Sequence, residues 1–138
     1  MSIEYRINHA ISGEQFRDLL SRTSLGARRP LDDSECMQGM AENGNLLITA
    51  WQGETLVGVA RSVTDFHFAC YLSDLAVDEN CQKMGIGKTL MKMTKAQLKP
   101  HCMLVLIAAP AASEYYGPLG MEHNQRCWVL PHGADFSF

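Results

Sequence analysis

The stretch Tyr71-Leu-Ser-Asp-Leu-Ala-Val-Asp-Glu-Asn-Cys-Gln-Lys-Met-Gly-Ile-Gly-Lys-Thr-Leu90 decides the fold of this chain. The residues up to Val77 are mostly apolar, as in a buried strand, and from Ile86 apolar residues recur at roughly helical spacing. Gly85 and Gly87 lie between these segments and lack a Cβ, so a ligand can come close to the main chain. The first N–H groups of a helix have no intrahelical partner and together carry about half a positive charge. A strand, a glycine turn and a helix in this order therefore predict a site for a pyrophosphate.

Two other phosphate-binding motifs fit this turn less well. A Walker A loop requires glycine where the chain has Gln82, so a nucleotide hydrolase using Gly87-Lys88-Thr89 is disfavoured. A dinucleotide fingerprint requires a third glycine where the chain has Leu90. It also requires a carboxylate about twenty residues later, and His101 to Leu106 offer none.

The remaining interpretation is a resemblance to a known family. The loop Gln82-Lys83-Met84-Gly85-Ile86-Gly87 resembles the Gln/Arg-x-x-Gly-x-Gly/Ala loop of the GNAT superfamily of N-acetyltransferases. Upstream, Asp74-Leu-Ala-Val-Asp78 is similar to the family's fourth strand. Downstream, Ala111-Ala-Ser-Glu-Tyr-Tyr-Gly-Pro-Leu-Gly-Met121 resembles the later signature of Ala, Phe-Tyr and Leu-Gly-Phe. The resemblance covers roughly Leu46 to Leu130, and it carries two motifs in the family's order.

The resemblance implies an α/β fold of the GNAT type, with a mostly antiparallel sheet, splayed central strands and flanking helices. A chain of 138 residues without a linker or an internal repeat is expected to form one domain over residues 1–138. Met103 to Ala108 is so uniformly apolar that we expect a central strand covered on both faces. The other predicted strands are Ile3 to Asn8, Leu46 to Gln52, Thr55 to Ser62, Ala69 to Val77, and about Met121 to Leu130. The predicted helices begin at Ser12 (ending near Gly26), at Asp32 or Asp33, at Ile86 and around Ala112.

Acetyl-coenzyme A is the cosubstrate that the resemblance implies, and no metal ion is expected. Its pyrophosphate suits the loop amides, and its pantetheine chain can pair like an added strand with the main chain before the loop. The residues expected to contact the carrier are Leu75, Ala76, Val77, Gln82, Lys83, Met84, Gly85, Ile86, Gly87 and Lys88.

Acetyl transfer to an amine needs two proton movements, and the sequence offers candidates for both. Tyr116 matches the family tyrosine beside the carrier's sulfur, so we expect it to protonate the departing thiolate. Ser73 stands where relatives often place a strand-four base; a serine is a poor base, but it could orient a water. Asp74 is the second candidate base, provided that a bulge turns it inward; otherwise it is a structural carboxylate. The asparagine that often follows strand five in relatives is missing from Ala108-Ala-Pro-Ala111.

The leading functional hypothesis is an N-acetyltransferase that moves the acetyl group to a primary amine by direct attack in a ternary complex. The alternative is a non-catalytic acyl-coenzyme A sensor on the same fold. The acceptor is a small molecule or a peptide, and Arg28 and Arg29 could recognise a carboxylate or phosphate on it, or form a solvated turn. The family resemblance also allows a homodimer.

Composition narrows the setting of this activity. A net charge of -3 provides no broad basic field, so we expect no nucleic-acid partner. The five cysteines are odd in number and form no C-x-x-C pair, so we expect reduced thiols without zinc or disulfides. No signal-peptide pattern or long apolar run is present, which predicts a cytoplasmic protein without a membrane partner.

Overall fold

The computed structural model describes residues 2–138, which divide into two compact units. The first unit ends at Ile107 and the second is Ala108–Phe138. The sheet and the α-helices of the described chain all belong to the first unit. That residues 1–138 form one domain stays a prediction.

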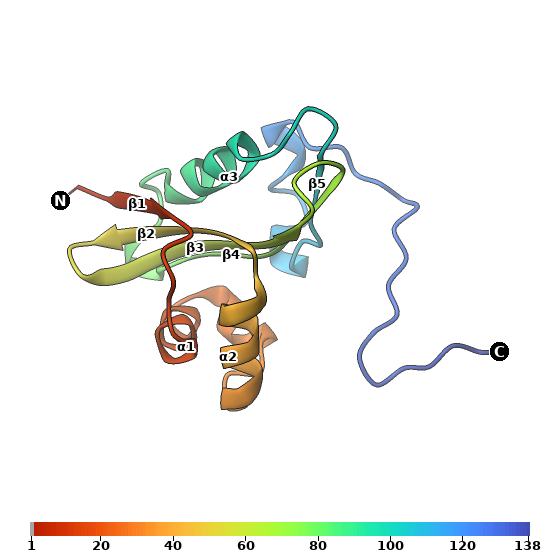
Figure 1. Ribbon diagram of the computed structural model, residues 1–138, viewed down its shortest axis with the longest axis horizontal. Coiled ribbons are helices and arrows are strands. Elements are labelled where there is room, and N and C mark those ends of the chain that lie inside the picture. The colour runs from red at the N-terminus through yellow and green to blue at the C-terminus, as the bar shows by residue number, and fades with distance from the viewer. Residues whose placement is uncertain (1) are drawn as a thin grey trace. The chain divides into compact units, whose positions relative to one another are not determined.

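A five-stranded sheet is the centre of the first unit (Figure 1). Its strands are β1 (Glu4–Ile7), β2 (Leu46–Gln52), β3 (Thr55–Thr64), β4 (Ala69–Val77) and β5 (Met103–Val105). They follow each other in space in chain order; β1 to β4 pair antiparallel, and β4 pairs parallel with β5. Gly53 turns the chain between β2 and β3 with a φ of +62°, a conformation that glycine adopts without steric cost. The predicted mostly antiparallel sheet is confirmed.

Helices α1 (Gly13–Ser21), α2 (Ser34–Asn43) and α3 (Ile86–Ala96) flank the sheet. Ser12 caps α1, because its hydroxyl accepts from the Gln15 N–H at 3.0 Å while the Gln15 side chain accepts from the Ser12 N–H. Asp33, one of the two predicted caps of α2, accepts from the Cys36 N–H at 3.0 Å. α1 ends at Ser21 and not near Gly26, since a short 3₁₀ helix occupies Ser24–Arg28.

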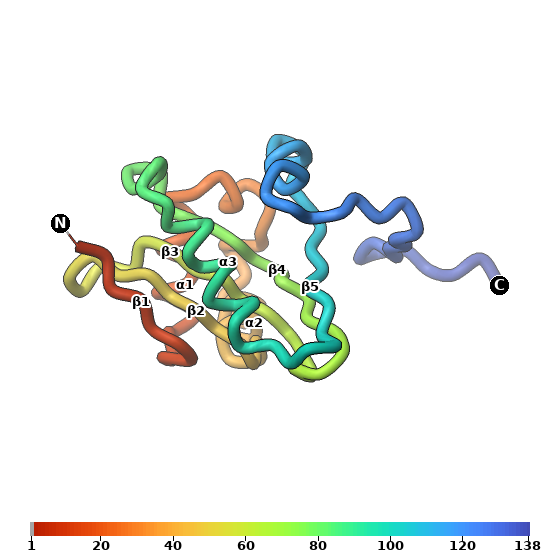
Figure 2. The backbone as a smooth tube through the Cα atoms, turned by 90° about the horizontal axis from the view of Figure 1, so that it is seen from above, coloured from red at the N-terminus to blue at the C-terminus, as the bar shows by residue number. Residues whose placement is uncertain are grey.

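The helices cover the two faces of the sheet separately. α1 and α2 lie on one face and α3 on the other (Figure 1), and Figure 2 shows α3 lying over the strands. The core between the sheet and α1 and α2 includes Phe16, Leu19, Leu20, Met37, Leu47, Val59 and Ala76. The core between the sheet and α3 includes Leu46, Ile48, Val57, Ala60, Leu72, Ile86 and Leu90.

Strand β5 pairs along its whole length, but only with the first three residues of β4. β5 pairs with Ala69, Cys70 and Tyr71, and β4 continues alone on that side to Val77. This separation corresponds to the predicted splaying, but it lies between β4 and the edge strand β5 and not between two central strands. The prediction that Met103 to Ala108 is a covered central strand is wrong, because β5 has three residues and forms the edge of the sheet, with Met103 56% exposed. A uniformly apolar run cannot distinguish an edge from a centre when only alternate residues reach the core.

The second unit contains two 3₁₀ helices, Pro110–Ala112 and Gly117–Leu119, and otherwise turns and coil. The 3₁₀ helix Pro110–Ala112 reaches only the first residue of the helix predicted around Ala112 to Tyr116, so that helix is wrong. The predicted strands from about Met121 to Leu130 are wrong as well. Pro118 lacks a main-chain donor, and Gly120 adopts the left-handed conformation at φ +100°, so the chain turns instead of continuing a helix. A strand also needs a partner for its main-chain hydrogen bonds, and residues 108–138 provide none.

None of the helices in residues 2–138 has the length and the apolar composition that a membrane-spanning helix requires.

Gly58 on β3 allows α3 to approach the sheet closely. A Cβ added there would lie 3.0 Å from Ile86 Cγ2 and 3.2 Å from Leu90 Cδ1. We therefore expect Gly58→Ala to lower the free energy of unfolding by about 1 to 3 kcal/mol through overpacking. Gly39→Ala in α2 is the matched control, since its Cβ would meet nothing within 4 Å. That change should raise stability by about 0.5 to 1 kcal/mol. Urea denaturation measures both, and equal effects at the two positions would contradict the close approach.

Candidate active site

The predicted anion site is a loop that leads from β4 into α3. Lys83 and Gly85 both adopt left-handed backbone, with φ of +67° and +75°. Gly85 is the N-cap of α3 and provides no side-chain cap. Within residues 2–138, no acceptor takes the N–H groups of Ile86, Gly87 or Lys88. These amides and the positive end of the helix form a place where a phosphate is stabilised.

Arg22 fixes the start of this loop. Its guanidinium donates to Asp78 Oδ2 and, at 2.9 Å, to the Leu56 carbonyl. The other Asp78 oxygen accepts from the Asn80 N–H at 2.8 Å, and the Glu79 N–H donates to the Arg22 carbonyl at 3.0 Å. Sequence reasoning missed Arg22, because it lies 56 residues from Asp78 and no local pattern links them.

The second half of β4 has unpaired main-chain groups on the side where β5 no longer runs beside it. The Asp78 N–H donates to the Val57 carbonyl at 2.8 Å, and antiparallel neighbours alternate between bonded and non-bonded pairs. Asp74 and Ala76 therefore bond toward β3, and the N–H and C=O groups of Leu75 and Val77 point to the opposite edge. Because β5 pairs no further than Tyr71, this edge is free for an extended ligand.

Asp74 is held between two arginines. Its side chain is 0% exposed, and its two oxygens accept from Arg29 Nε and from Arg61 Nε, each at 2.6 Å. The same guanidiniums hold Ser73: Arg29 Nη2 donates to its carbonyl at 3.0 Å, and Arg61 Nη2 donates to its hydroxyl at 3.1 Å. Arg61 Nη1 also donates to the Met40 carbonyl at 3.2 Å. The structure thus brings Ser73, Asp74 and Arg29 together and adds Arg61, which sequence reasoning missed.

A bulge in β4 produces this arrangement. Arg61 pairs with Asp74 while the next β3 residue, Ser62, pairs with Leu72, so Ser73 is the extra residue. Leu72 consequently packs in the core beside α3, whereas Asp74 and Ala76 face α1 and α2. Both Asp74 oxygens are already occupied by guanidinium donors. This geometry fits a structural carboxylate better than a base, and the catalytic roles of Asp74 and Ser73 stay predictions.

Tyr116 belongs to the second unit, whereas the carrier and β4 residues belong to the first. Its ring meets Tyr115 edge-on with centroids 5.1 Å apart. Burial raises the pKa of the Tyr116 hydroxyl, and the neighbouring Tyr115 adds to the rise. The group therefore keeps its proton throughout the neutral range, as a proton donor must.

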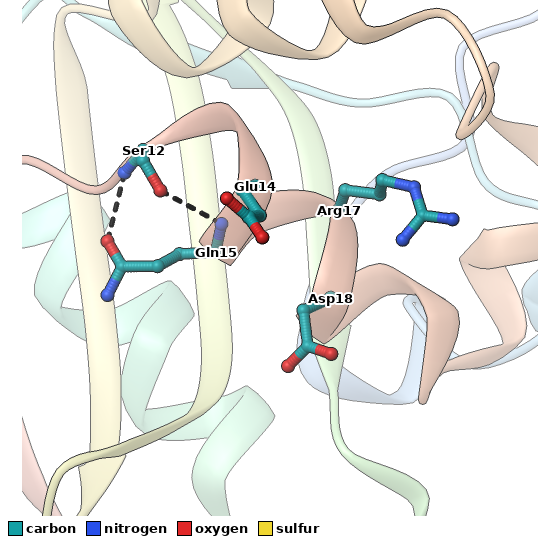
Figure 3. A pocket seen from close by; sticks show the side chains of 5 residues that line it. All are labelled: Ser12, Glu14, Gln15, Arg17 and Asp18. Carbon is teal, nitrogen blue, oxygen red and sulfur yellow. Dashed lines mark hydrogen bonds between the residues drawn. The ribbon is translucent and has the colours of Figure 1, made fainter.

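A surface hollow on α1 involves other residues. Ser12, Glu14, Gln15, Arg17 and Asp18 line it, and Figure 3 shows the two hydrogen bonds of the Ser12–Gln15 cap at its rim. Its acidic and basic side chains are mixed and largely exposed. None of them is a predicted site residue.

The two left-handed residues of the loop allow a matched test. Gly85→Ala places a Cβ in backbone that costs an L-residue about 1 to 2 kcal/mol, although that Cβ meets no atom within 4 Å. We expect Gly85→Ala to lower stability and to weaken binding of acetyl-coenzyme A, because the loop amides must shift. Lys83→Gly removes the same strain and should not lower stability. Thermal unfolding and calorimetry check both, and a Gly85→Ala protein with unchanged stability and affinity would contradict the described loop.

Comparison with known proteins identifies the family. Residues 23–126 match the family described as acetyltransferase (GNAT) domain, whereas curated proteins yielded no match. A GNAT-family acetyltransferase from Streptococcus pneumoniae TIGR4 is similar in structure, with a TM-score of 0.74, 20% identity, and coverage of 93% of this chain and 98% of the other. A ribosomal-protein-alanine N-acetyltransferase from Brucella melitensis biovar Abortus 2308 has a TM-score of 0.72, 16% identity, and coverage of 96% and 100%.

An aminoglycoside acetyltransferase from an uncultured soil metagenomic sample is also similar, with a TM-score of 0.64, 18% identity, and coverage of 96% of this chain and 97% of the other. At these identities the likeness shows the fold alone. The family match, in contrast, spans well over half of the 138 residues. The chain belongs to the GNAT family of acetyltransferases.

Proposed function

We propose that the protein is an N-acetyltransferase that transfers the acetyl group of acetyl-coenzyme A to a primary amine in a ternary complex. One observation carries the proposal: in a GNAT chain, the free amides of Ile86 to Lys88 begin close after the unpaired edge of β4. This arrangement suits a ligand that has a diphosphate at one end and an amide-bearing arm at the other.

Two parts of the carrier would contact the first unit. The pyrophosphate would lie on the loop from Gln82 to Lys88, bound mainly by main-chain donors. The pantetheine amides would pair with the free N–H and C=O groups of Leu75 and Val77. Lys83 and Lys88 are exposed, so their charges add only a screened attraction to the phosphates.

The transfer forms one bond and breaks another. The neutral amine attacks the thioester carbon, the C–S bond breaks, the nitrogen gives up a proton, and the thiolate takes one to become a thiol. The Leu75 N–H would stabilise the negative charge that develops on the acetyl oxygen. Tyr116 would supply the proton to the sulfur, because a phenol that stays protonated at neutral pH is an adequate donor to a thiolate.

Removal of the amine proton is assigned to a water held at Ser73. A lysine-like amine is neutral in only about one molecule per thousand at pH 7.4, so a route for its proton is needed. Asp74 is the other candidate, but both its oxygens already accept from guanidiniums. The Ser73 hydroxyl accepts from Arg61 and still has its own hydrogen to orient a water.

A non-catalytic sensor of acyl-coenzyme A is the second candidate. The ion-paired state of Asp74 favours it, since β4 then provides no free carboxylate. A sensor would bind the carrier as tightly as an enzyme but would leave its thioester intact.

Binding and turnover separate these functions. Acetyl-coenzyme A should produce heat in calorimetry and, at about 100 times its dissociation constant, raise the free energy of unfolding by about 2.7 kcal/mol. With a panel of primary amines, the release of free thiol should exceed the rate without amine. Binding without turnover on any amine would favour the sensor, and an absence of binding would refute both functions.

Tyr116→Phe tests the proton donor. Loss of general acid catalysis typically costs about 100-fold to 10,000-fold, so we expect kcat to fall within that range while the dissociation constant for acetyl-coenzyme A changes little. Tyr115→Phe is the matched control, because Tyr115 is 41% exposed and has no proposed role. Equal kcat values for Tyr116→Phe and the wild type would remove Tyr116 from the mechanism.

A further inference from the structure

The cluster of Arg29, Asp74 and Arg61 carries more positive than negative charge. A guanidinium keeps its charge in proteins, so two of them around one carboxylate leave a net charge of +1. Within residues 2–138, neither arginine pairs with a second carboxylate. Asp74 is 0% exposed and the Arg61 side chain only 9%, and an unbalanced charge in such a place is costly. The cluster is therefore suited to a further anion.

Arg29 is the member of the cluster that an anion can reach, because 22% of its side chain is exposed. A guanidinium has five N–H donors, and Arg29 uses three: Nε for Asp74, Nη1 for the Arg28 carbonyl and Nη2 for Ser73. One hydrogen on each Nη stays available to donate to an anion such as a carboxylate.

The cluster also lies beside the proposed transfer point. Ser73 and Asp74 directly precede Leu75, and two residues of a strand span only about 6.6 Å. The cluster faces α1 and α2, and the pyrophosphate loop begins α3 on the other face of the sheet. An acceptor on the α1 and α2 face can thus place an anion on Arg29 while its amine is near the acyl carbon. A short separation between these two points fits an acceptor that carries its amine near its carboxylate.

We infer that Arg29, positioned by Asp74, binds the carboxylate of the acceptor, so that the acceptors are amino acids with a free carboxylate. This inference rests on the proposed acetyl transfer and narrows it. Polyamines and aminoglycosides, which carry amines without a carboxylate, would be poor acceptors.

Paired acceptors test the inference in the full chain. Glycine, alanine, glutamate, lysine and phenylalanine are each compared with the corresponding C-terminal amide, and thiol release from acetyl-coenzyme A is followed. We expect kcat/KM at least 10-fold higher for the best free acid than for its amide. Arg29→Gln should abolish this preference, because it leaves Asp74 paired with Arg61 and the cluster neutral. Lys92→Gln, which removes one exposed cation from α3, should keep the preference.

The outcomes distinguish this inference from the proposed function. A protein that acetylates the amides as well as the acids retains the function and overturns the carboxylate site. If no amine is acetylated, binding of the reaction products tests the carboxylate site instead. N-acetyl amino acids and their amides can be compared as ligands without turnover. A rise in the unfolding temperature with the acids alone, lost in Arg29→Gln and kept in Lys92→Gln, supports the site. Equal shifts from acids and amides, or no shift from either, overturn it.

Discussion

The ion pairs of one buried carboxylate organise the middle of this molecule. Asp74 joins the segment after α1, through Arg29, to the neighbouring strand β3, through Arg61. Charged groups out of water are tolerated only when they are paired with good geometry, and removing one partner of a buried pair typically costs about 3 to 5 kcal/mol. The bulge at Ser73, the position of Arg29 and the side to which Asp74 points are therefore linked, and none can change alone.

The free edge of β4 and its face toward α1 and α2 differ in which groups they expose. At the edge, Leu75 and Val77 offer main-chain groups to an extended ligand, which requires no particular side chain. On the face toward α1 and α2, Asp74 fixes two guanidiniums, and there the identity of the side chains determines what can bind. A GNAT protein can in this way keep the site for its carrier while the site for its acceptor changes.

Local rules predicted much of the first unit. The caps at Ser12 and Asp33, the hairpin at Gly53 and the strand–glycine–helix order around Gly85 depend on neighbours in sequence, so the sequence was sufficient to find them. The pairing of Asp74 with Arg29 and Arg61 depends on strand register and on a bulge. On a regular strand Leu72 and Asp74 would share a face, but the extra residue Ser73 puts Leu72 on the other face.

The later part of the chain was predicted less well. Apolar residues from Met103 onward indicated a covered strand, but the pattern of a single segment does not show how many neighbours a strand has. In residues 108–138 a strand would need a hydrogen-bonding partner, and sequence periodicity says nothing about whether one exists. The role of Tyr116 was likewise inferred from family resemblance and not from any pattern in the chain.

The contact between Arg22 and Asp78 makes the integrity of a helix matter for ligand capture. Arg22 closes the C-terminal end of α1, where its N–H donates to the Leu19 carbonyl, and it also holds the residue at which the loop leaves β4. When the last turn of α1 frays, the loop loses its anchor in the same event. Under the proposed function, mild heating would then release acetyl-coenzyme A while the sheet is still intact.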